Sequence, residues 1–190
     1  MNLRVRRTQK LLREALIKLI EERGFDKLTV REISEGAMVS RAAFYRNYQD
    51  KYDLVEHIFG ETIEELFMAV SETVTEHPPQ IWVSFFENIA KDERLYRALL
   101  GGRGSPWFVQ KMRTMLIDLL KEYQPQPTWQ STPDKPLYPA KDEFVPEIIA
   151  SVFVEAITWW LEQGRPYTPQ EMANRCISLT SAIFTETSRW

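Results

Sequence analysis

Apolar residues recur every three or four positions along most of the chain, which is the spacing of one face of an α-helix. Near the N-terminus this set includes Leu12 and Leu16, and Gly24 follows as a candidate C-cap. Thr29 and Glu32 match a capping box, so a short helix is expected directly after Thr29. No segment shows the apolar–polar alternation of a half-buried strand. The pattern predicts an all-α protein.

Caps and helix breakers set the expected bounds of the other helices. Ser40 is a good N-cap for a helix over residues 41–46, and Asp50 is one for a longer helix from residue 51. Further helices are expected over residues 81–90, 93–100, 106–123, 143–163 and 169–188. Five prolines between residues 124 and 140 predict a loop there.

Composition excludes several classes of protein without naming a function. The 190 residues are 44% hydrophobic and 27% charged, which is ordinary for a soluble globular chain. No continuous apolar run reaches the roughly 18 residues of a membrane helix, and the charged N-terminus lacks a secretory signal pattern. Cys176 is the single cysteine, so an internal disulfide and a Cys/His zinc site are excluded. We therefore expect a cytoplasmic protein with no metal, no cofactor and no membrane partner.

Charge is distributed unevenly along the chain. Residues 1–60 hold 12 Lys and Arg against 9 Asp and Glu, whereas residues 61–190 hold 12 against 18. A basic N-terminal segment on an acidic body suggests that this end binds a polyanion. A chance scatter of surface charge is the alternative.

The two short helices expected on either side of the turn at residues 37–39 form a helix-turn-helix. In this arrangement the second helix lies in the DNA major groove, where its first residues reach base edges or phosphates. The sequence therefore predicts that the helix after Ser40 is a recognition helix.

The same region closely resembles the TetR family of bacterial regulators (TetR/AcrR-like). TVREI from Thr29, AMVSRAAFYRNY from Ala37 and KYDL from Lys51 match the family wording T-V-R-x-I, A-G-V-S-x-x-x-F/L-Y-x-H/Y-F and K-x-x-L. The resemblance covers about residues 7–60. It implies a three-helix DNA-binding head over residues 1–50 and a larger helical domain for regulation and dimerisation over residues 51–190.

One residue of the motif departs from the family pattern. Met38 stands where the family usually has Gly, which adopts a positive φ without a side-chain penalty. An ordinary residue with positive φ costs roughly 1 kcal/mol. Either Met38 bears this strain, or the turn has a slightly different conformation.

The predicted DNA-binding set is Thr29, Ser40, Arg41, Ala42, Tyr45, Arg46, Asn47 and Lys51. The two N-cap residues can hydrogen-bond phosphate, the two arginines can reach phosphate or guanine, and the small alanine permits close approach to the groove. The resemblance implies that Tyr45 and Lys51 contact the phosphate backbone. Phe44 and Tyr48 are expected to pack the head.

Three more cations, Arg4, Arg6 and Arg7, form a candidate arm with additional phosphate contacts. The alternative for every cation is a solvated surface position, and for every tyrosine a place in the core. The ordered motif outweighs this alternative for Arg41 and Tyr45, and also for Lys51. It does not do so for the arm.

The last two helices carry unusually wide apolar stripes, which suggests burial on two sides. The predicted dimer interface comprises Ile149, Phe153, Ile157, Trp160, Cys176, Leu179 and Ile183. The resemblance implies a four-helix interface between two copies of the chain. The alternative is that both stripes are internal core, and Cys176 is itself typical of a buried small hydrophobe.

A set of aromatic and methionine residues is a candidate lining for an effector pocket. It comprises Trp82, Phe86, Trp107, Phe108, Met112, Met115 and Trp159. Such a pocket would suit a small apolar or aromatic effector. At helical spacing the alternative is that these residues only fill the core.

These observations favour a homodimeric transcription regulator that binds double-stranded DNA at a palindromic operator, as a repressor released by a small molecule. The alternative is a TetR-like adaptor or coactivator that works through a protein partner. The segment over residues 159–169 resembles the terminal-helix junction of some Gram-positive members of the family, which supports this alternative. No phosphate-binding loop, serine-hydrolase motif or zinc-protease motif is present, so an enzyme is not expected.

Overall fold

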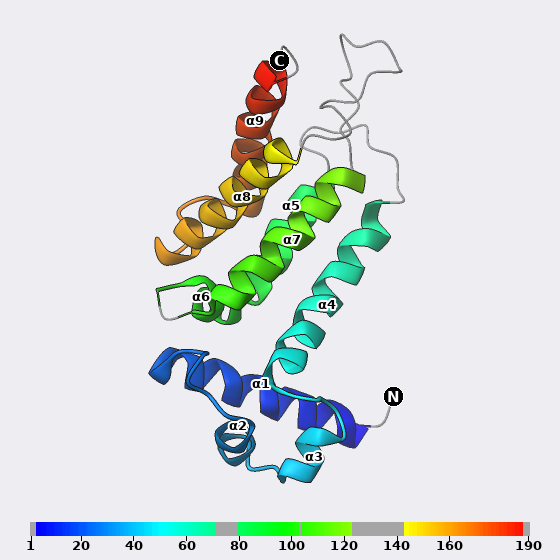
Figure 1. Ribbon diagram of the computed structural model, residues 1–190, viewed down its shortest axis with the longest axis vertical. Helices are drawn as coiled ribbons and strands as arrows, with labels where there is room; N and C mark the ends of the chain where they lie inside the picture. Colours follow the sequence, from blue (N-terminus) through cyan, green and yellow to red (C-terminus); the bar gives the residue numbers. More distant parts are fainter. Residues whose placement is uncertain (1–2, 71–79, 103, 123–142, 188–190) are drawn as a thin grey trace. The chain divides into compact units, whose positions relative to one another are not determined.

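The computed structural model describes residues 3–70, 80–102, 104–122 and 143–187, and every regular element in these ranges is an α-helix (Figure 1). The helices are α1 (Leu3–Arg23), α2 (Val30–Gly36), α3 (Arg41–Tyr45), α4 (Lys51–Val70), α5 (Gln80–Lys91), α6 (Glu93–Leu100), α7 (Pro106–Glu122), α8 (Phe144–Glu162) and α9 (Pro169–Thr187). The all-α prediction is confirmed. The loop predicted over residues 124–140 lies outside the described residues.

The chain divides into two compact units, residues 1–105 with α1–α6 and residues 106–190 with α7–α9. The boundary expected at residue 50 falls inside the first unit. A separation of DNA-binding and regulatory roles at that residue therefore remains a functional proposal.

In the first unit, α1 packs against α2 and α6, and α2 packs against α3. Leu12, Leu16 and Ile20 of α1 are fully buried, as are Ile33 of α2 and Phe44 of α3. These side chains form the core that holds the helix-turn-helix on α1.

Ion pairs connect α1 to α6 in this unit. The Arg94 guanidinium binds the Glu21 carboxylate through two hydrogen bonds of 2.9 and 2.7 Å. Arg13 forms an ion pair with Asp92, the residue before α6. The side of α1 that carries Arg13 and Glu21 therefore faces α6.

Local sequence sets the bounds of these helices as expected. Gly24 has φ 80°, and its N–H donates to the Ile20 carbonyl at 2.8 Å, which ends α1. The Asp50 carboxylate accepts from the N–H groups of Tyr52 and Asp53 at 2.8 and 2.9 Å, which begins α4. The predicted caps at both positions are confirmed.

In the second unit, α8 packs against both α7 and α9. By length and composition alone α8 could cross a membrane, with a mean hydropathy of 1.5. Half of this apolar stretch is buried inside the structure, and Glu147 and Glu155 are exposed on the helix. These features are those of the central helix of a folded domain.

Candidate nucleic-acid interface

The turn between α2 and α3 contains a strained residue. Met38 has φ 54°, in the left-handed region that glycine occupies without penalty. The Met38 N–H donates to the Glu35 carbonyl and the Val39 N–H to the Ser34 carbonyl, each at 3.0 Å. Of the two possibilities raised by the sequence, the structure shows the strained one. The Met38 side chain is 92% exposed, so no packing contact compensates for the strain.

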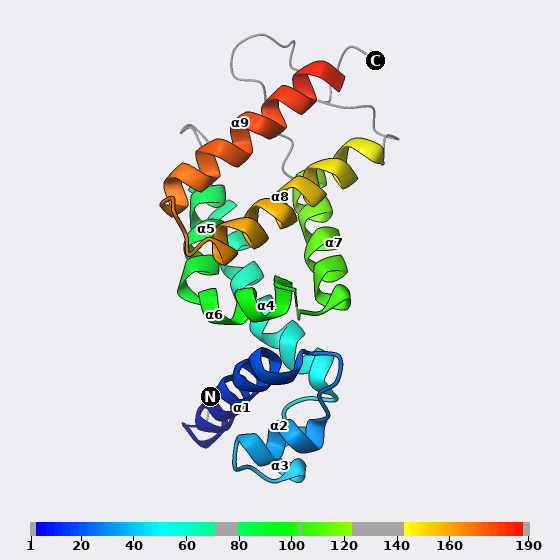
Figure 2. The ribbon, with the colours of Figure 1, turned by 90° about the vertical axis from the view of Figure 1, so that its left-hand side faces the viewer.

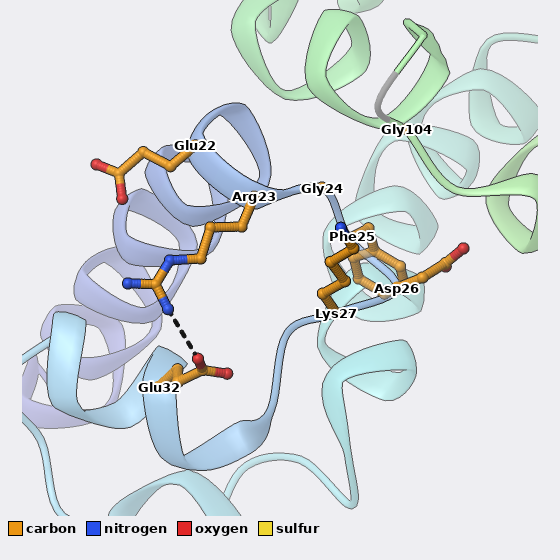
Figure 3. Close-up of a pocket in the computed structure, with 8 residues that line it drawn as sticks. All are labelled: Glu22, Arg23, Gly24, Phe25, Asp26, Lys27, Glu32 and Gly104. Atoms are coloured by element: carbon orange, nitrogen blue, oxygen red, sulfur yellow. Dashed lines mark hydrogen bonds and ion pairs between the residues drawn. The ribbon is translucent and has the colours of Figure 1, made fainter.

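The N-terminus of α2 is closed by the predicted capping box. The Thr29 N–H and hydroxyl donate to the Glu32 carboxylate at 2.9 and 2.8 Å, and the Glu32 N–H donates to the Thr29 hydroxyl at 3.3 Å. Arg23 also donates to Glu32, at 3.0 Å (Figure 3). Hydrogen bonds from Thr29 lower the pKa of the Glu32 carboxyl, and the positive charge of Arg23 adds to the effect.

This arrangement corrects the prediction for Thr29. The N–H and hydroxyl that would bind phosphate bond to a carboxylate of the same helix instead. The negative charge of Glu32 also repels a second anion at this place. Thr29 is therefore a structural cap and leaves the proposed DNA-binding set.

The recognition helix α3 is only five residues long and is held at both ends by side chains. The Ser40 hydroxyl accepts from the Ala43 N–H at 3.1 Å, as an N-cap does. The Asn47 side-chain amide donates to the Ala43 carbonyl at 2.7 Å near the other end. Asn47 is half-buried, so the structure gives it a capping role.

A buried aromatic side chain anchors α3 to the head. Phe44 is fully buried, and its ring centroid lies 5.6 Å from that of Tyr45 and 5.7 Å from that of Tyr48. Tyr48 is also buried, whereas Tyr45 is 58% exposed. The predicted packing roles of Phe44 and Tyr48 are confirmed.

The opposite side of α3 presents polar and small side chains to solvent. Arg41, Ala42, Tyr45 and Arg46 are all exposed, and Ser40 is exposed at the cap. A hydroxyl that accepts a cap bond keeps its own proton for a phosphate oxygen. This face combines two cations, a phenol, a hydroxyl and a methyl group, which is chemistry that suits phosphates and base edges.

Lys51 does not lie on this face, which corrects another prediction. Its ammonium donates to the carbonyls of Phe25 and Asp26 at 3.0 and 2.9 Å and lies 4.6 Å from the centroid of the Phe25 ring. The residue is only 8% exposed. Burial lowers the pKa of the ammonium, and the carboxylates of Asp26 and Asp50 oppose this change. Lys51 fixes the start of α4 to the connection between α1 and α2.

Most of the predicted dimer-interface residues are buried within the single chain. Ile149, Phe153, Ile157, Trp160 and Cys176 have at most 1% of their surface exposed. A side chain that is already buried cannot bury further surface against a second copy, so these five are corrected to core residues. Leu179 is 57% exposed and Ile183 is half-buried. Phe144 and Ile148 of α8 are exposed apolar residues that are not among the predicted interface residues.

The predicted effector residues fall into three groups by exposure. Trp82, Phe86, Phe108 and Met112 are buried, Trp107 and Met115 are half-buried, and Trp159 is 44% exposed. The four buried residues fit the alternative interpretation, in which these side chains only fill the core.

Two open hollows formed by described residues have a different lining. One is lined by residues 22–27, Glu32 and Gly104 (Figure 3), and the other by Glu171, Asn174, Arg175, Ser178 and Leu179. None of the seven predicted effector residues lines either hollow. Most residues that line the two hollows are charged or polar, unlike the aromatic and methionine lining that the sequence predicted.

Comparison with known families finds matches over most of the chain. Residues 12–58 match a model described as bacterial regulatory proteins, tetR family. Residues 76–182 match a model described as transcriptional regulator C-terminal region, whose name, TetR_C_8, also carries the family name. The second match alone covers more than half of the chain.

Matches to individual proteins are shorter or more distant. YxbF of Bacillus subtilis, an uncharacterized HTH-type transcriptional regulator, is 36% identical over 59 residues, which are 31% of this chain and 16% of YxbF. A TetR transcriptional regulator from Streptococcus agalactiae has a similar structure, with a TM-score of 0.63, 21% identity and coverage of 93% and 95% of the two chains. NalD, the secondary repressor of the MexAB-OprM multidrug efflux pump in Pseudomonas aeruginosa, gives a TM-score of 0.61 and 17% identity over 95% and 97% of the chains. The likeness to these two structures shows a shared fold.

Proposed function

The chain belongs to the TetR family of bacterial transcriptional regulators, and on this premise we propose that it is a homodimeric repressor of a palindromic operator, released by a small molecule. The observation that carries the proposal is the exposed side of α3. Arg41, Ala42, Tyr45 and Arg46 are presented there while Phe44 fixes the helix to the core. A recognition helix of this kind places its first residues against base edges and phosphates. These four residues and Ser40 form the proposed DNA-binding set.

Exposed apolar residues on the terminal helices support a homodimer. Phe144, Ile148 and Leu179 are each at least 40% exposed on α8 and α9. One five-residue recognition helix reads few bases, so a two-fold dimer that reads two half-sites supplies the missing specificity. We propose that these residues, with Ile183, lie in the dimer interface.

In the proposed dimer, a small molecule acts on the spacing of the two recognition helices. The two recognition helices of a dimer must stand about 34 Å apart to enter successive major grooves. An effector that binds better to a different head spacing shifts the population away from the DNA-binding state. The similarity to NalD, a repressor by its name, supports repression as the sign of regulation. A DNA-binding regulator of this kind works in the cytoplasm.

A second candidate function is action through a protein partner, and a surface at the α8–α9 junction favours it. The Arg175 guanidinium lies 3.9 Å from the centroid of the Tyr167 ring. The rings of Trp159 and Tyr167 have centroids 6.1 Å apart and planes tilted by 31°. Tryptophan, tyrosine and arginine are the residue types that dominate binding energy in protein interfaces.

The test begins with selection of binding sites from a random duplex library, followed by measurement of affinity for the selected duplex at increasing salt. We expect a palindromic site, a dimer by light scattering, and a slope of log K against log[salt] near −0.9 for each phosphate contact. Arg41→Gln should weaken binding, whereas Lys18→Gln, which removes an exposed cation elsewhere on the head, should not. If no duplex is enriched, or if the affinity does not depend on salt, the proposal fails. Co-purification of a stable partner together with absent DNA binding would favour the second candidate.

A further inference from the structure

The first turns of α1 carry an excess of positive charge. Arg4, Arg6, Arg7 and Lys10 are all exposed, and the first acidic residue of the helix is Glu14. Cations at the N-terminus of a helix oppose the helix dipole, which favours negative charge there. This arrangement is therefore unfavourable for the helix itself, and such local conflicts are expected at functional sites.

These cations belong to a regular helix. α1 begins at Leu3, and the Thr8 hydroxyl donates to the Arg4 carbonyl at 3.0 Å within its first turns. The arm considered from the sequence is therefore part of α1. The positions of its side chains around the helix axis follow from the helical repeat.

Arg4 and Arg6 lie on different sides of α1. Arg4 is three turns before Ala15, and a β-carbon built on Gly36 of α2 would lie 3.5 Å from the Ala15 β-carbon, so this side faces α2. Arg6 is two turns before Arg13, which pairs with Asp92 at the start of α6. Two residues two positions apart point to nearly opposite sides of a helix. Arg4 is thus on the side of the helix-turn-helix, and Arg6 is on the side of α6.

The N-terminal end of α1 also lies at the same end of the first unit as α3. Figures 1 and 2, which differ by a quarter turn, both show the first turns of α1 close to α3. A duplex that receives α3 in its major groove brings its sugar–phosphate backbone past this end of the head.

We propose that Arg4 binds a backbone phosphate of the DNA next to the groove that α3 enters, which makes the first turn of α1 a second DNA-contacting element. This inference rests on the proposed DNA binding. The contact is electrostatic, so it raises affinity for every sequence equally and carries no base preference. Arg7, one turn after Arg4, extends the same basic surface.

The matched pair Arg4→Gln and Arg6→Gln tests the proposal, because both remove one cation from the same turn of α1. The full chain is titrated with the selected duplex and with a random duplex, at several salt concentrations between about 0.05 and 0.3 M, to give the slope of log K against log[salt]. For each subunit on the duplex, Arg4→Gln is expected to reduce the slope by about 0.9, which corresponds to about an eightfold loss of affinity at 0.1 M salt. The loss should be the same for both duplexes. Arg6→Gln should leave the slope unchanged.

A thermal melt of each variant separates this contact from a structural effect. Removal of a cation from the start of a helix should leave the melting temperature unchanged or raise it, so Arg4→Gln is expected to lose affinity without losing stability. Equal slopes for Arg4→Gln, Arg6→Gln and the parent protein would overturn the inference and leave the proposed function intact. A parent protein that binds no duplex would instead overturn the proposed function.

Discussion

The strained turn before the recognition helix leads to a prediction about stability. Met38 has φ 54° and a side chain that is 92% exposed, and its backbone N–H bonds to the Glu35 carbonyl at 3.0 Å. A substitution at this position therefore changes backbone preference with almost no change in packing. Replacing Met38 with Asn or Gly, which tolerate a positive φ, should raise the free energy of unfolding.

The expected size follows from two opposing effects. Relief of the left-handed conformation contributes about 1 kcal/mol, with an upper range near 2. Glycine also gives the unfolded chain more freedom, which removes about 0.4–1 kcal/mol of that gain. Met38→Asn should therefore stabilise the protein by about 1 kcal/mol, and Met38→Gly by about half of that or less. Met38→Val, a β-branched residue, should be less stable than the parent protein.

Urea denaturation followed by circular dichroism measures these differences, at one fixed protein concentration because association would shift the midpoint. The expected order of midpoints is Asn, then Gly, then Met, then Val, with an unchanged slope. An Asn variant no more stable than the parent, together with a Val variant no less stable, would refute the reasoning that φ at this turn is strained.

Three other predictions concern buried and capping groups. Lys51→Met should lower the free energy of unfolding by about 2 kcal/mol, because two carbonyls lose a charged donor. The salt slope of DNA binding should stay unchanged, and a reduced slope would show that Lys51 contacts a phosphate instead. Hydrogen bonds hold the pKa of the Glu32 carboxyl below its ordinary value in the folded state. The Glu32 carboxylate therefore stabilises the fold fully at pH values above its pKa in the unfolded chain, and this contribution is lost as the pH falls through its pKa in the folded protein. Unfolding midpoints between pH 6 and 3 should thus fall less steeply in Glu32→Gln, and parallel curves would contradict this role. Burial raises the pKa of the Cys176 thiol to about 12, so a chromogenic disulfide at pH 8 should react with it only after unfolding, and rapid reaction of the native protein would show that the site is open.

The sequence determined the helices and much of the recognition motif. The bounds at Gly24, Thr29, Ser40 and Asp50 were predictable because each cap bond joins residues at most four positions apart. The same short range explains why the exposed face of α3 was found. Residues 41–45 form little more than one turn, and Phe44 fixes which side is buried.

Only the tertiary structure decided the roles of residues whose surroundings come from distant parts of the chain. The motif predicts that Lys51 is a surface cation, but the partners of its ammonium group are carbonyls 25 and 26 residues earlier. On α8 the apolar stripe is wide, and periodicity alone cannot tell a core contact from an interface contact. The packing of α7 and α9 against α8 buries Ile149, Phe153 and Ile157, whereas Ile148 keeps 40% of its surface exposed. The hydrogen bonds that cap a helix join neighbouring residues, so they can be predicted from the sequence. The burial of a side chain depends on which helices pack over it, and these come from distant parts of the chain.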